Sequence, residues 1–349
     1  MLDILNYRNS KTNPVYIIAE AGVNHNGDPE LAKKLIYSAK ESGADCVKFQ
    51  TFIAEEVASA NAPKAKYQLK VTDVQESQLD MLRKLELPRA CYPELMKLCE
   101  SIGIDFLSTP YSIGDAAFLN SMGVEAFKIA SGQLVEPHFL EFVAGFGKPL
   151  ILSTGMATLS EVAAGVEAVL KSGNDQIVVL QCTTNYPSKI EDANLLTIPS
   201  MKDALGVVIG YSDHIESNYA CFAAVALGAK VIEKHFTLDR SMPGPDHSCS
   251  LQPEGFLELV NGIREVEKAL GSSVKKPTEA EEANKEGMRR SIASSRNIKK
   301  GEVLTSDLLC FKRPATGLAP NKLTEIIGLR AAKEIEADTL ISSSMIEWE

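Results

Sequence analysis

Residues 206–236 read GVVIGYSDHIESNYACFAAVALGAKVIEKHF. An apolar, β-branched run is followed by a helical stretch at 217–227 and then by a second apolar run. This order predicts two parallel strands joined by a crossover helix, because parallel strands need a long connection between them. The same alternation recurs along most of the chain and predicts eight strands, at 15–21, 45–51, 105–109, 126–131, 149–154, 176–182, 206–213 and 230–236.

The number of these units favours a closed barrel. Eight strand–helix units over roughly 270 residues, ending in a helix at 253–270, fit a (β/α)8 TIM barrel, which typically has about 250 residues. Helices are also expected at 29–42, 92–102 and 159–171. A doubly wound open sheet is the alternative α/β fold, but it normally carries a glycine-rich phosphate loop, and neither GxGxxG nor GxxxxGKS/T occurs. We therefore predict a TIM-barrel catalytic domain over residues 1–271.

Two connections in the predicted barrel are longer than the repeat requires. Residues 52–88 separate the second strand from the next helical stretch, and a connection of that length is typical of an active-site cover or a small subdomain. Residues 188–205 form the other, where we expect a short helix in place of a full one.

The composition changes after the barrel. Residues 272–287, SSVKKPTEAEEANKEG, are polar and highly charged, which predicts a linker. Residues 288–349 regain apolar side chains and contain a weak repeat, because 297–309 resembles 334–346. Each copy is expected to form a turn, a short strand and one helical turn, so we predict a small pseudo-symmetric β-rich domain. A domain of about 60 residues is only marginally stable alone, and we expect it to dock on a larger surface such as the barrel mouth.

The composition of the 349 residues limits the classes of function. Apolar residues make up 45% and charged residues 23%, and the formal net charge is -10. Such a charge argues against nucleic acid or an anionic membrane as the main partner. No apolar run approaches the roughly 20 residues that span a bilayer, and residues 1–13 lack the features of a secretory signal, so we expect a cytoplasmic protein. The seven cysteines contain no CxxC pair and are expected to be reduced thiols in the core.

Polar residues end all eight predicted strands, where a TIM barrel places its active site. Lys48 and Lys128 each follow an apolar run, and we interpret them as two fixed cations for a phosphate and a carboxylate. Two alternatives are a structural lysine paired with a carboxylate such as Glu20, and a Schiff-base lysine of a class I aldolase. The other strand-end residues that we expect to bind substrate are Gln50, Thr109, Ser131, Gln133, Ser153, Thr184, Tyr186 and Ser212.

Two of the five histidines, His214 and His235, close adjacent predicted strands. Two imidazoles side by side, with no thiolate pair, predict a site for a divalent cation such as Mn²⁺ or Mg²⁺, with Co²⁺ as a further option. Such a cation keeps open positions for a substrate carbonyl and a water. Glu20 and Asp246 are candidate catalytic carboxylates. Each could orient a substrate hydroxyl, a metal-bound water or a lysine, or make only local structural hydrogen bonds.

Seven motifs carry these residues: AEAGVNHNG (19–27), VKFQT (47–51), FKIASG (127–132), LSTGM (152–156), GYSDH (210–214), EKHFT (233–237) and GPDH (244–247). Together they resemble the N-acetylneuraminate (sialic acid) synthase family, which includes the legionaminic and pseudaminic acid synthases. Residues 288–349 are similar to the antifreeze-like SAF domain that follows the barrel in this family. The resemblance covers nearly the whole chain.

The resemblance implies an enzyme, a transferase that condenses phosphoenolpyruvate with an N-acylated amino sugar. The sugar would be N-acetylmannosamine or 2,4-diacetamido-2,4,6-trideoxymannose, the product a nonulosonic acid of the sialic or legionaminic type, and phosphate would leave by C–O cleavage. It also implies that His214 and His235 hold the metal, and that Lys48, Lys128 and the strand-end hydroxyls bind phosphoenolpyruvate. Water would be activated near the metal, with Glu20 as a candidate base.

A further implication of the resemblance is a domain-swapped homodimer, in which the small domain of one chain caps the barrel of the other and Arg313 reaches the N-acetyl group of the sugar. Gln133 departs from the family, in which an acidic residue usually follows the FKIASG motif. An amide cannot take up a proton at neutral pH, so this position leaves the identity of the sugar open. Two other functions remain as alternatives: a Schiff-base aldolase that uses Lys128, and a non-catalytic protein that binds ice or glycan through its terminal domain.

Overall fold

The computed structural model describes residues 14–65, 68–73 and 75–348. The expectation that residues 1–13 carry no secretory signal therefore concerns a segment outside these ranges. The chain divides between Gly271 and Ser272 into two compact units, and each has its own hydrophobic core. None of the helices in the described ranges is long and apolar enough to cross a membrane. All seven cysteines are free thiols, as predicted, although two of them are only partly buried.

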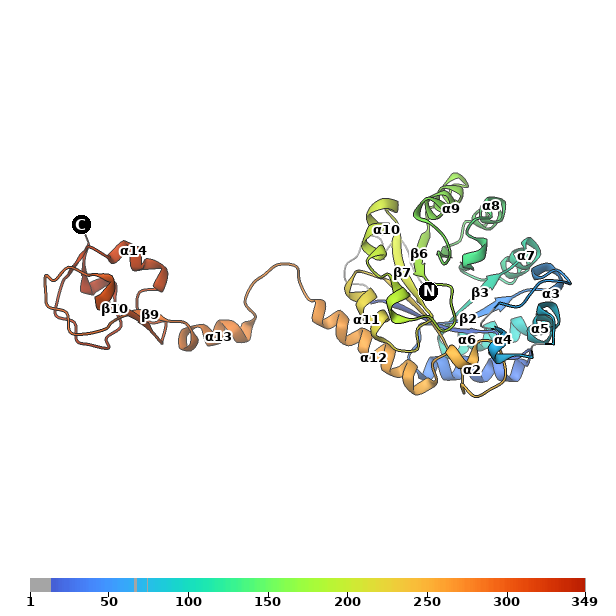
Figure 1. The fold of residues 1–349 in the computed structure, drawn as a ribbon, viewed down its shortest axis with the longest axis horizontal. Helices are drawn as coiled ribbons and strands as arrows, with labels where there is room; N and C mark the ends of the chain where they lie inside the picture. Colours follow the sequence, from blue (N-terminus) through green and yellow to red (C-terminus); the bar gives the residue numbers. More distant parts are fainter. Residues whose placement is uncertain (1–13, 66–67, 74, 349) are drawn as a thin grey trace. The chain divides into compact units, whose positions relative to one another are not determined.

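The first unit is a barrel of parallel strands (Figure 1). Hydrogen bonds connect the strands in the order β3-β2-β1-β8-β7-β6-β5-β4, and β3 also packs against β4, which closes the ring. The predicted TIM barrel is therefore confirmed, and the open doubly wound sheet is excluded. The strands are β1 (Tyr16–Gly22), β2 (Cys46–Thr51), β3 (Asp105–Pro110), β4 (Phe127–Ile129), β5 (Leu150–Ser153), β6 (Ile177–Cys182), β7 (Val208–Asp213) and β8 (Val231–His235).

Each barrel strand presents alternate side chains to the barrel interior, and this alternation positions the polar residues. An apolar layer fills the interior, with Ile18 of β1 and Val231 of β8 among its members. Two residues further along the same strands the interior positions become charged, because Glu20 follows Ile18 and Glu233 follows Val231. The intervening residues pack outwards in the core between strands and helices. An apolar layer thus supports a polar layer at the carboxyl ends of the strands.

Helices cover the outside of the barrel and bury their apolar faces against the strands. Local signals set where they begin. Asp28 caps α2 by accepting a hydrogen bond from the Glu30 N–H, and Thr158 and Glu161 form a capping box at the start of α9. The covering helices are α2 (Pro29–Glu41), α6 (Tyr92–Ile102), α7 (Ile113–Ser121), α8 (Pro137–Ala144), α9 (Leu159–Lys171), α10 (Thr197–Leu205), α11 (Tyr219–Ala226) and α12 (Pro253–Leu270).

The two long connections contain helices of their own. The 52–88 connection holds the short helices α3 (Ala54–Val57), α4 (Gln68–Val71) and α5 (Gln78–Leu85). Phe52, Met81 and Leu85 pack with Val23, which follows β1, in a small separate core. This core holds the connection at the carboxyl ends of β1 and β2. The 188–205 connection contains a 3-10 helix, Ile190–Ala193, before α10.

The second unit shows the predicted internal repeat. Ile298 and Ile335 occupy equivalent positions in the two copies and exchange two backbone hydrogen bonds, of 2.8 and 2.9 Å. Each copy has a 3-10 helix, Ser306–Leu308 or Ser343–Met345, and a strand that the prediction did not include follows it. The elements of this unit are α13 (Glu279–Met288), β9 (Ser291–Ser294), β10 (Leu309–Lys312), α14 (Leu323–Ile326), β11 (Arg330–Ala331) and β12 (Ile346–Glu347).

Within the segment predicted as a linker, residues 279–287 form most of the helix α13, an element that the prediction did not include. This helix begins with a capping box, in which Thr278 Oγ1 accepts from the Glu281 N–H and the Glu281 carboxylate accepts from the Thr278 N–H. Glutamate, alanine and lysine all favour helix, so the segment folds although none of its side chains is buried. Polar composition alone does not distinguish such a helix from a linker.

Candidate active site

A cavity of about 670 Å³ opens at the carboxyl ends of the barrel strands, and residues from every strand end and from the 52–88 connection line it. All residues that the sequence marks as site candidates lie here except Arg313, which is exposed in the second unit. The candidates in the cavity are Glu20, Lys48, Gln50, Thr109, Lys128, Ser131, Gln133, Ser153, Thr184, Tyr186, Ser212, His214, His235 and Asp246.

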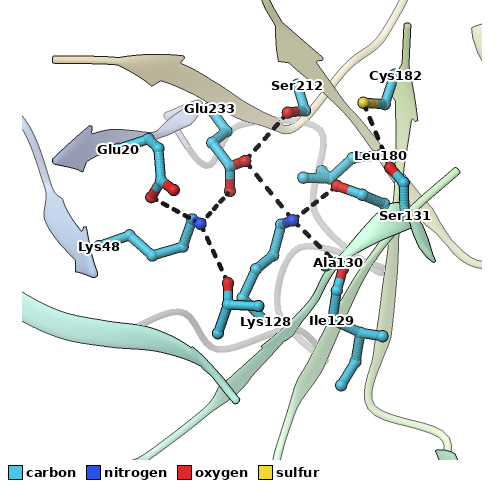
Figure 2. A network of polar contacts seen from close by, with 12 residues as sticks. Glu20, Lys48, Lys128, Ile129, Ala130, Ser131, Leu180, Cys182, Ser212 and Glu233 are labelled. Carbon is cyan, nitrogen blue, oxygen red and sulfur yellow. Dashed lines mark hydrogen bonds and ion pairs between the residues drawn. The ribbon is translucent and has the colours of Figure 1, made fainter. Parts of the chain in front are cut away.

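Four buried charged side chains form an alternating chain in this cavity, drawn in Figure 2. Lys48 Nζ lies 2.6 Å from Glu20 Oε2 and 3.8 Å from Glu233 Oε2. Lys128 Nζ lies 3.6 Å from Glu233 Oε1. The charges of the four side chains sum to zero. The alternative that a strand-end lysine pairs with Glu20 is therefore confirmed for Lys48, although both members of the pair still face the cavity.

Three hydroxyl groups add hydrogen bonds to the charge chain. The two ammonium groups donate to Thr109 Oγ1 at 3.2 Å and to Ser153 Oγ at 2.6 Å. Ser212 Oγ donates to Glu233 Oε1 at 3.0 Å. Burying ions costs free energy that their mutual attraction offsets only when such contacts satisfy the remaining lone pairs and protons. These three hydroxyls therefore stabilise the charges and also lie where they could turn towards a bound anion.

Burial and the alternating neighbours shift the pKa values of the four groups. Burial would lower the pKa of Lys48, but Glu20 and Glu233 together raise it above its ordinary value. Burial would raise the pKa of Glu233, but Lys128 and Lys48 lower it. Burial raises the pKa of Glu20, although Lys48 opposes the shift. The pKa of Lys128 is lowered, chiefly by burial, and this is a direction that a Schiff-base lysine also requires.

Glu233 is absent from the predicted site although it contacts both lysines. The two-residue period of β8 is the signal that identifies it, because Val231, Glu233 and His235 share the inward face. Asp213 and Lys234 also end strands, but they lie on outward faces and form a buried ion pair of 2.5 Å outside the cavity. Not every polar residue at a strand end therefore faces the cavity.

An amide holds Glu20 from the side opposite Lys48. Gln50 Nε2 donates to Glu20 Oε1 at 3.1 Å, and Tyr111 OH donates to Gln50 Oε1 at 3.2 Å. The tyrosine thus sets which end of the amide faces the carboxylate. Gly22 beside them has a φ of +54°, and a Cβ there would lie 3.1 Å from Glu20 Oε1. Tyr111, which follows β3, is a second cavity residue that the sequence analysis missed.

His214 and His235 lie side by side as predicted, with ring centroids 5.2 Å apart. Nδ1 of His214 lies 2.7 Å from the carbonyl oxygen of Thr183 and must donate to it. Nδ1 of His235 is buried with no hydrogen-bond partner in the part of the chain that the structure describes. Burial, and then His214, lower the pKa of His235 well below its ordinary value, so this imidazole is neutral. A neutral imidazole with an unsatisfied nitrogen, such as that of His235, is suited to bind a cation.

The two imidazoles of His214 and His235 fit a divalent cation that takes most of its ligands from substrate and water. Among the described residues, no group of three or more His, Cys, Asp or Glu side chains is arranged to hold a metal. A pair of imidazoles that faces a cavity leaves most coordination positions open, as a catalytic site requires and a structural site does not.

Asp246 enters the cavity from the loop that follows β8. Asn24 Nδ2 donates to Phe236 O and to Ser250 Oγ, both at 2.9 Å, and Ser250 Oγ donates to the backbone oxygen of Asp246 at 2.6 Å. These contacts join the loops that follow β1 and β8. Burial and then Glu20 raise the pKa of Asp246 to about 7, so its carboxyl is partly protonated at neutral pH.

The cavity also has a neutral polar sector, at the ends of β4 and β6. Gln133 Nε2 and Thr184 Oγ1 are buried there with no hydrogen-bond partner among the described residues. Ser131 Oγ accepts from the backbone N–H of Gly155 at 3.0 Å. A Cβ on Gly155 would lie 1.9 Å from Thr184 Oγ1, so only glycine leaves room at this position.

An apolar sector comes from the 52–88 connection, which therefore lines the cavity, as its length suggested. Phe52, Val57, Met81, Leu82 and Leu85 contribute side chains to it. The cavity thus combines buried charges, an imidazole pair, neutral polar groups and an apolar wall. It can hold an anion and a second, largely uncharged molecule together.

Comparisons with known proteins agree with this geometry. The sequence model of the NeuB family matches residues 35–275, and that of the SAF domain matches residues 289–347. The N,N'-diacetyllegionaminic acid synthase of Campylobacter jejuni is 46% identical over 327 residues, which is 93% of this chain and 98% of that protein. The synthase of the same name from Legionella pneumophila is 43% identical over 336 residues, 95% of this chain and 94% of that protein. The crystal structure of an N-acetylneuraminic acid synthetase from Leptospira borgpetersenii has a TM-score of 0.71 at 33% identity and covers 78% of this chain and 90% of its own.

Replacing Lys48 by methionine should destabilise the barrel, because Glu20 and Glu233 would be buried without the cation that they share. Breaking a buried ion pair costs about 3–5 kcal/mol. In the variant the folded-state pKa of Glu20, which has lost its counter-ion, rises further above its unfolded value, so stability is lost as pH rises and the deficit shrinks as pH falls.

Urea denaturation at about pH 5 and about pH 8 measures this deficit. The matched control is the double variant Lys48→Met with Glu20→Gln, which removes the carboxylate left without a cation and should recover part of the stability, while Glu233 keeps Lys128. A deficit that is equal at the two pH values would contradict the assignment.

Proposed function

Because the chain belongs to the NeuB family, we propose that it is a synthase that condenses phosphoenolpyruvate with an N-acylated amino sugar to form a nonulosonic acid. Phosphate leaves by C–O cleavage. The observation that carries this proposal is the pair of buried lysines, Lys48 and Lys128, that share one carboxylate in the barrel mouth. Two fixed ammonium groups match the two anionic ends of phosphoenolpyruvate.

Lys48 and Lys128 bind the phosphate and the carboxylate of phosphoenolpyruvate in this proposal. The hydroxyls of Thr109 and Ser153, which now accept from the ammonium groups, turn and donate to the ligand oxygens. The charges of the four side chains in the charge chain sum to zero before substrate binds. An incoming anion makes the cavity negative and therefore favours proton uptake by a carboxyl group. Asp246, whose pKa is raised to about 7, is the carboxyl that takes up this proton.

The chemistry follows from these positions. C3 of phosphoenolpyruvate attacks the aldehyde carbon of the open-chain sugar, and the aldehyde oxygen takes the proton of Asp246, whose pKa is raised to about 7. Water adds at C2 of phosphoenolpyruvate, and Glu20 accepts one of its protons. The tetrahedral carbon then loses phosphate together with the proton of the new C2 hydroxyl, which leaves a ketone. The lysines neutralise the charge on the departing phosphate.

We propose that His214 and His235 hold a divalent cation, most simply Mn²⁺, with Mg²⁺ and Co²⁺ as alternatives. When bound, such a cation polarises a carbonyl and lowers the pKa of a bound water. The neutral imidazole of His235, with a nitrogen that has no partner among the described residues, supports this role. The ring of Tyr186, whose centroid lies 4.2 Å from that of His214, helps to orient that imidazole.

The sugar that we propose is 2,4-diacetamido-2,4,6-trideoxymannose, which gives N,N'-diacetyllegionaminic acid. Relatives at 46% and 43% identity are synthases of that product. The apolar sector also supports this choice, with Val57 and Leu82 among its side chains. The trideoxy sugar has a C6 methyl and two acetyl methyls, so it presents more apolar surface to such a wall than N-acetylmannosamine does.

We also propose that the protein is a cytoplasmic, domain-swapped homodimer, in which the SAF domain of the partner caps the cavity. The match to that domain over residues 289–347 supports this arrangement. Arg313 is exposed and forms no hydrogen bond or ion pair with any residue in the described ranges, so its guanidinium is available for an acetamido oxygen of the sugar.

Purified protein with phosphoenolpyruvate, Mn²⁺ and 2,4-diacetamido-2,4,6-trideoxymannose should release phosphate, and EDTA should abolish the release. N-acetylmannosamine should react at least about tenfold more slowly, because it lacks apolar groups that the cavity buries. His214→Ala should lower the rate by more than about 100-fold, as expected when a metal ligand is lost.

Two outcomes would contradict this function. EDTA-resistant turnover, with a keto acid trapped on Lys128 by borohydride, would favour the aldolase. If no sugar leads to phosphate release, the result would favour the alternative that the protein binds ice or glycan without catalysis.

The KM for phosphoenolpyruvate should rise as pH increases through about 7, because Asp246, with its pKa raised to about 7, then becomes negative beside a trianionic substrate. Asp246→Asn stays neutral at every pH and should flatten this dependence, while its kcat falls with the lost proton donor. Initial rates between about pH 6 and about pH 8.5 measure both constants. A KM profile that is the same in the variant and in the wild type would remove Asp246 from this role.

Mixing two inactive variants tests the swapped dimer. Arg313→Ala chains keep an intact barrel, and Lys128→Ala chains keep an intact arginine. In a swapped heterodimer one of the two sites receives both intact parts, so the mixture, unfolded and refolded together, should recover up to about a quarter of the wild-type activity. No recovery, in a sample that ultracentrifugation shows to be dimeric, would mean that each chain caps its own barrel.

A further inference from the structure

Gln133 carries a buried amide whose donor group has no partner. It ends a short 3-10 helix, Ser131–Gln133, directly after β4, lines the cavity and is only 5% exposed. Its Oε1 accepts a hydrogen bond from the backbone N–H of Ala130 at 3.4 Å. Because that N–H can only donate, it sets the orientation of the amide. Nε2 is buried and has no partner among the described residues.

Neither of the two hydroxyls on the same wall of the cavity, those of Ser131 and Thr184, accepts a hydrogen bond from Gln133. Ser131 Oγ accepts from Gly155 N at 3.0 Å and donates to Cys182 Sγ at 3.6 Å. Thr184 Oγ1, on the same wall of the cavity, is also buried without a partner among the described residues. A buried donor without an acceptor is costly and rare in folded proteins. Such a group in a cavity wall marks a position where a ligand supplies the acceptor.

We infer that Gln133 Nε2 donates a hydrogen bond to the carbonyl oxygen of an acylamino group of the sugar, and that Gln133 thereby selects the sugar. The inference rests on the proposed function and names the residue that recognises one of the substrate's acyl groups by a hydrogen bond. The anionic ends of phosphoenolpyruvate have the ammonium groups of Lys48 and Lys128, so the uncharged amide is left for the uncharged substrate.

The chemistry of an amide carbonyl makes this contact selective. A sugar hydroxyl can rotate to accept from an amide or to donate to a carboxylate, so it would tolerate either group at position 133. A carbonyl oxygen can only accept, so it tolerates an N–H donor and rejects a carboxylate. An amide carries no charge and neither gains nor loses a proton at neutral pH. Gln133 is therefore a binding residue and not an acid or a base.

Gln133→Glu is the informative variant because it changes the hydrogen bonding without changing the shape. A carboxylate oxygen can still accept from the Ala130 N–H, so the 3-10 helix keeps its contact, while the oxygen that replaces Nε2 faces the sugar as an acceptor. The KM for 2,4-diacetamido-2,4,6-trideoxymannose should rise by roughly 30-fold or more, because two acceptors then face each other. The KM for phosphoenolpyruvate should change by less than about threefold, since Gln133 does not contact the lysines.

Two further variants complete the test. Gln133→Met removes the donor without adding charge, and the KM for the sugar should rise by roughly fivefold to tenfold, less than in Gln133→Glu. Gln78→Glu is the matched control, because Gln78 lines the same cavity but is partly exposed, so it adds the same charge where water can solvate it. Its KM for the sugar should change by less than about threefold.

The outcomes separate this inference from the proposed function. If the wild type releases phosphate and the KM for the sugar is unchanged in Gln133→Glu, the group facing Gln133 is a hydroxyl and the inference is overturned while the function stands. Equal increases in Gln133→Glu and Gln78→Glu would also overturn it, because a general effect of charge would then explain both. If the wild type releases no phosphate with any sugar, the function fails and this inference fails with it. Should Gln133→Glu not fold, as circular dichroism would reveal, the rise or constancy of KM in Gln133→Met decides the question.

Discussion

The carboxylate of Glu233 lies between two buried ammonium groups, and the polar end of the barrel depends on this contact. Glu20 can neutralise Lys48, but Glu233 is the acidic side chain that reaches Lys128 among the described residues. Two like charges buried without counter-ions would repel each other, and burial would drive both lysines towards their neutral forms. Strand register produces the arrangement, because Glu20 pairs with Lys48 on one side of β1 and with His235 of β8 on the other. One carboxylate thus allows two cations to share a cavity that can accept a dianionic ligand.

The remaining walls of the cavity divide according to strand order. The apolar sector lies over β1 and β2, the neutral polar groups end β4 and β6, and the imidazoles end β7 and β8. An anion and a neutral sugar therefore meet different chemistry within one cavity. In the proposed function the charges attract the anion, while the apolar wall and the unsatisfied amide select the sugar by shape and hydrogen bonding. Because these sectors come from different strands, one of them can change without the other.

Much of the barrel could be predicted from the sequence because its signals are local. Eight β-branched runs with helical stretches between them define the strands, and their polar ends identify Lys48, Lys128, His214 and His235. Glu233 required the strand period as well, since only the side chains on the face shared with His235 reach the cavity. Lys234, one residue away, faces outwards and pairs with Asp213.

Other parts of the site could not be predicted because they depend on packing between distant segments. The described residues of the 52–88 connection form no strand or long helix whose period reveals a face. Its apolar residues reach the cavity through the small core that they form with Val23. Tyr111 lies just beyond β3, and its role depends on where the side chain of Gln50 lies. In residues 272–287 the composition indicated a linker, but a capping box at Thr278 starts a helix, because local hydrogen bonds and helix propensity outweigh the lack of apolar residues.

The contact between the loops after β1 and β8 has a consequence for biosynthesis. Asn24 and Phe236 are separated by 212 residues, and β1 meets β8 only when the last strand has been made. A ribosome adds roughly 5–20 residues per second, so about 10–40 s pass between the synthesis of β1 and the synthesis of β8, its second pairing partner. Throughout that interval one edge of β1 stays unpaired, and Lys128, made about halfway through it, lacks Glu233 until β8 is made. The nascent chain therefore exposes a bare strand edge, a feature that makes incomplete folds prone to aggregate.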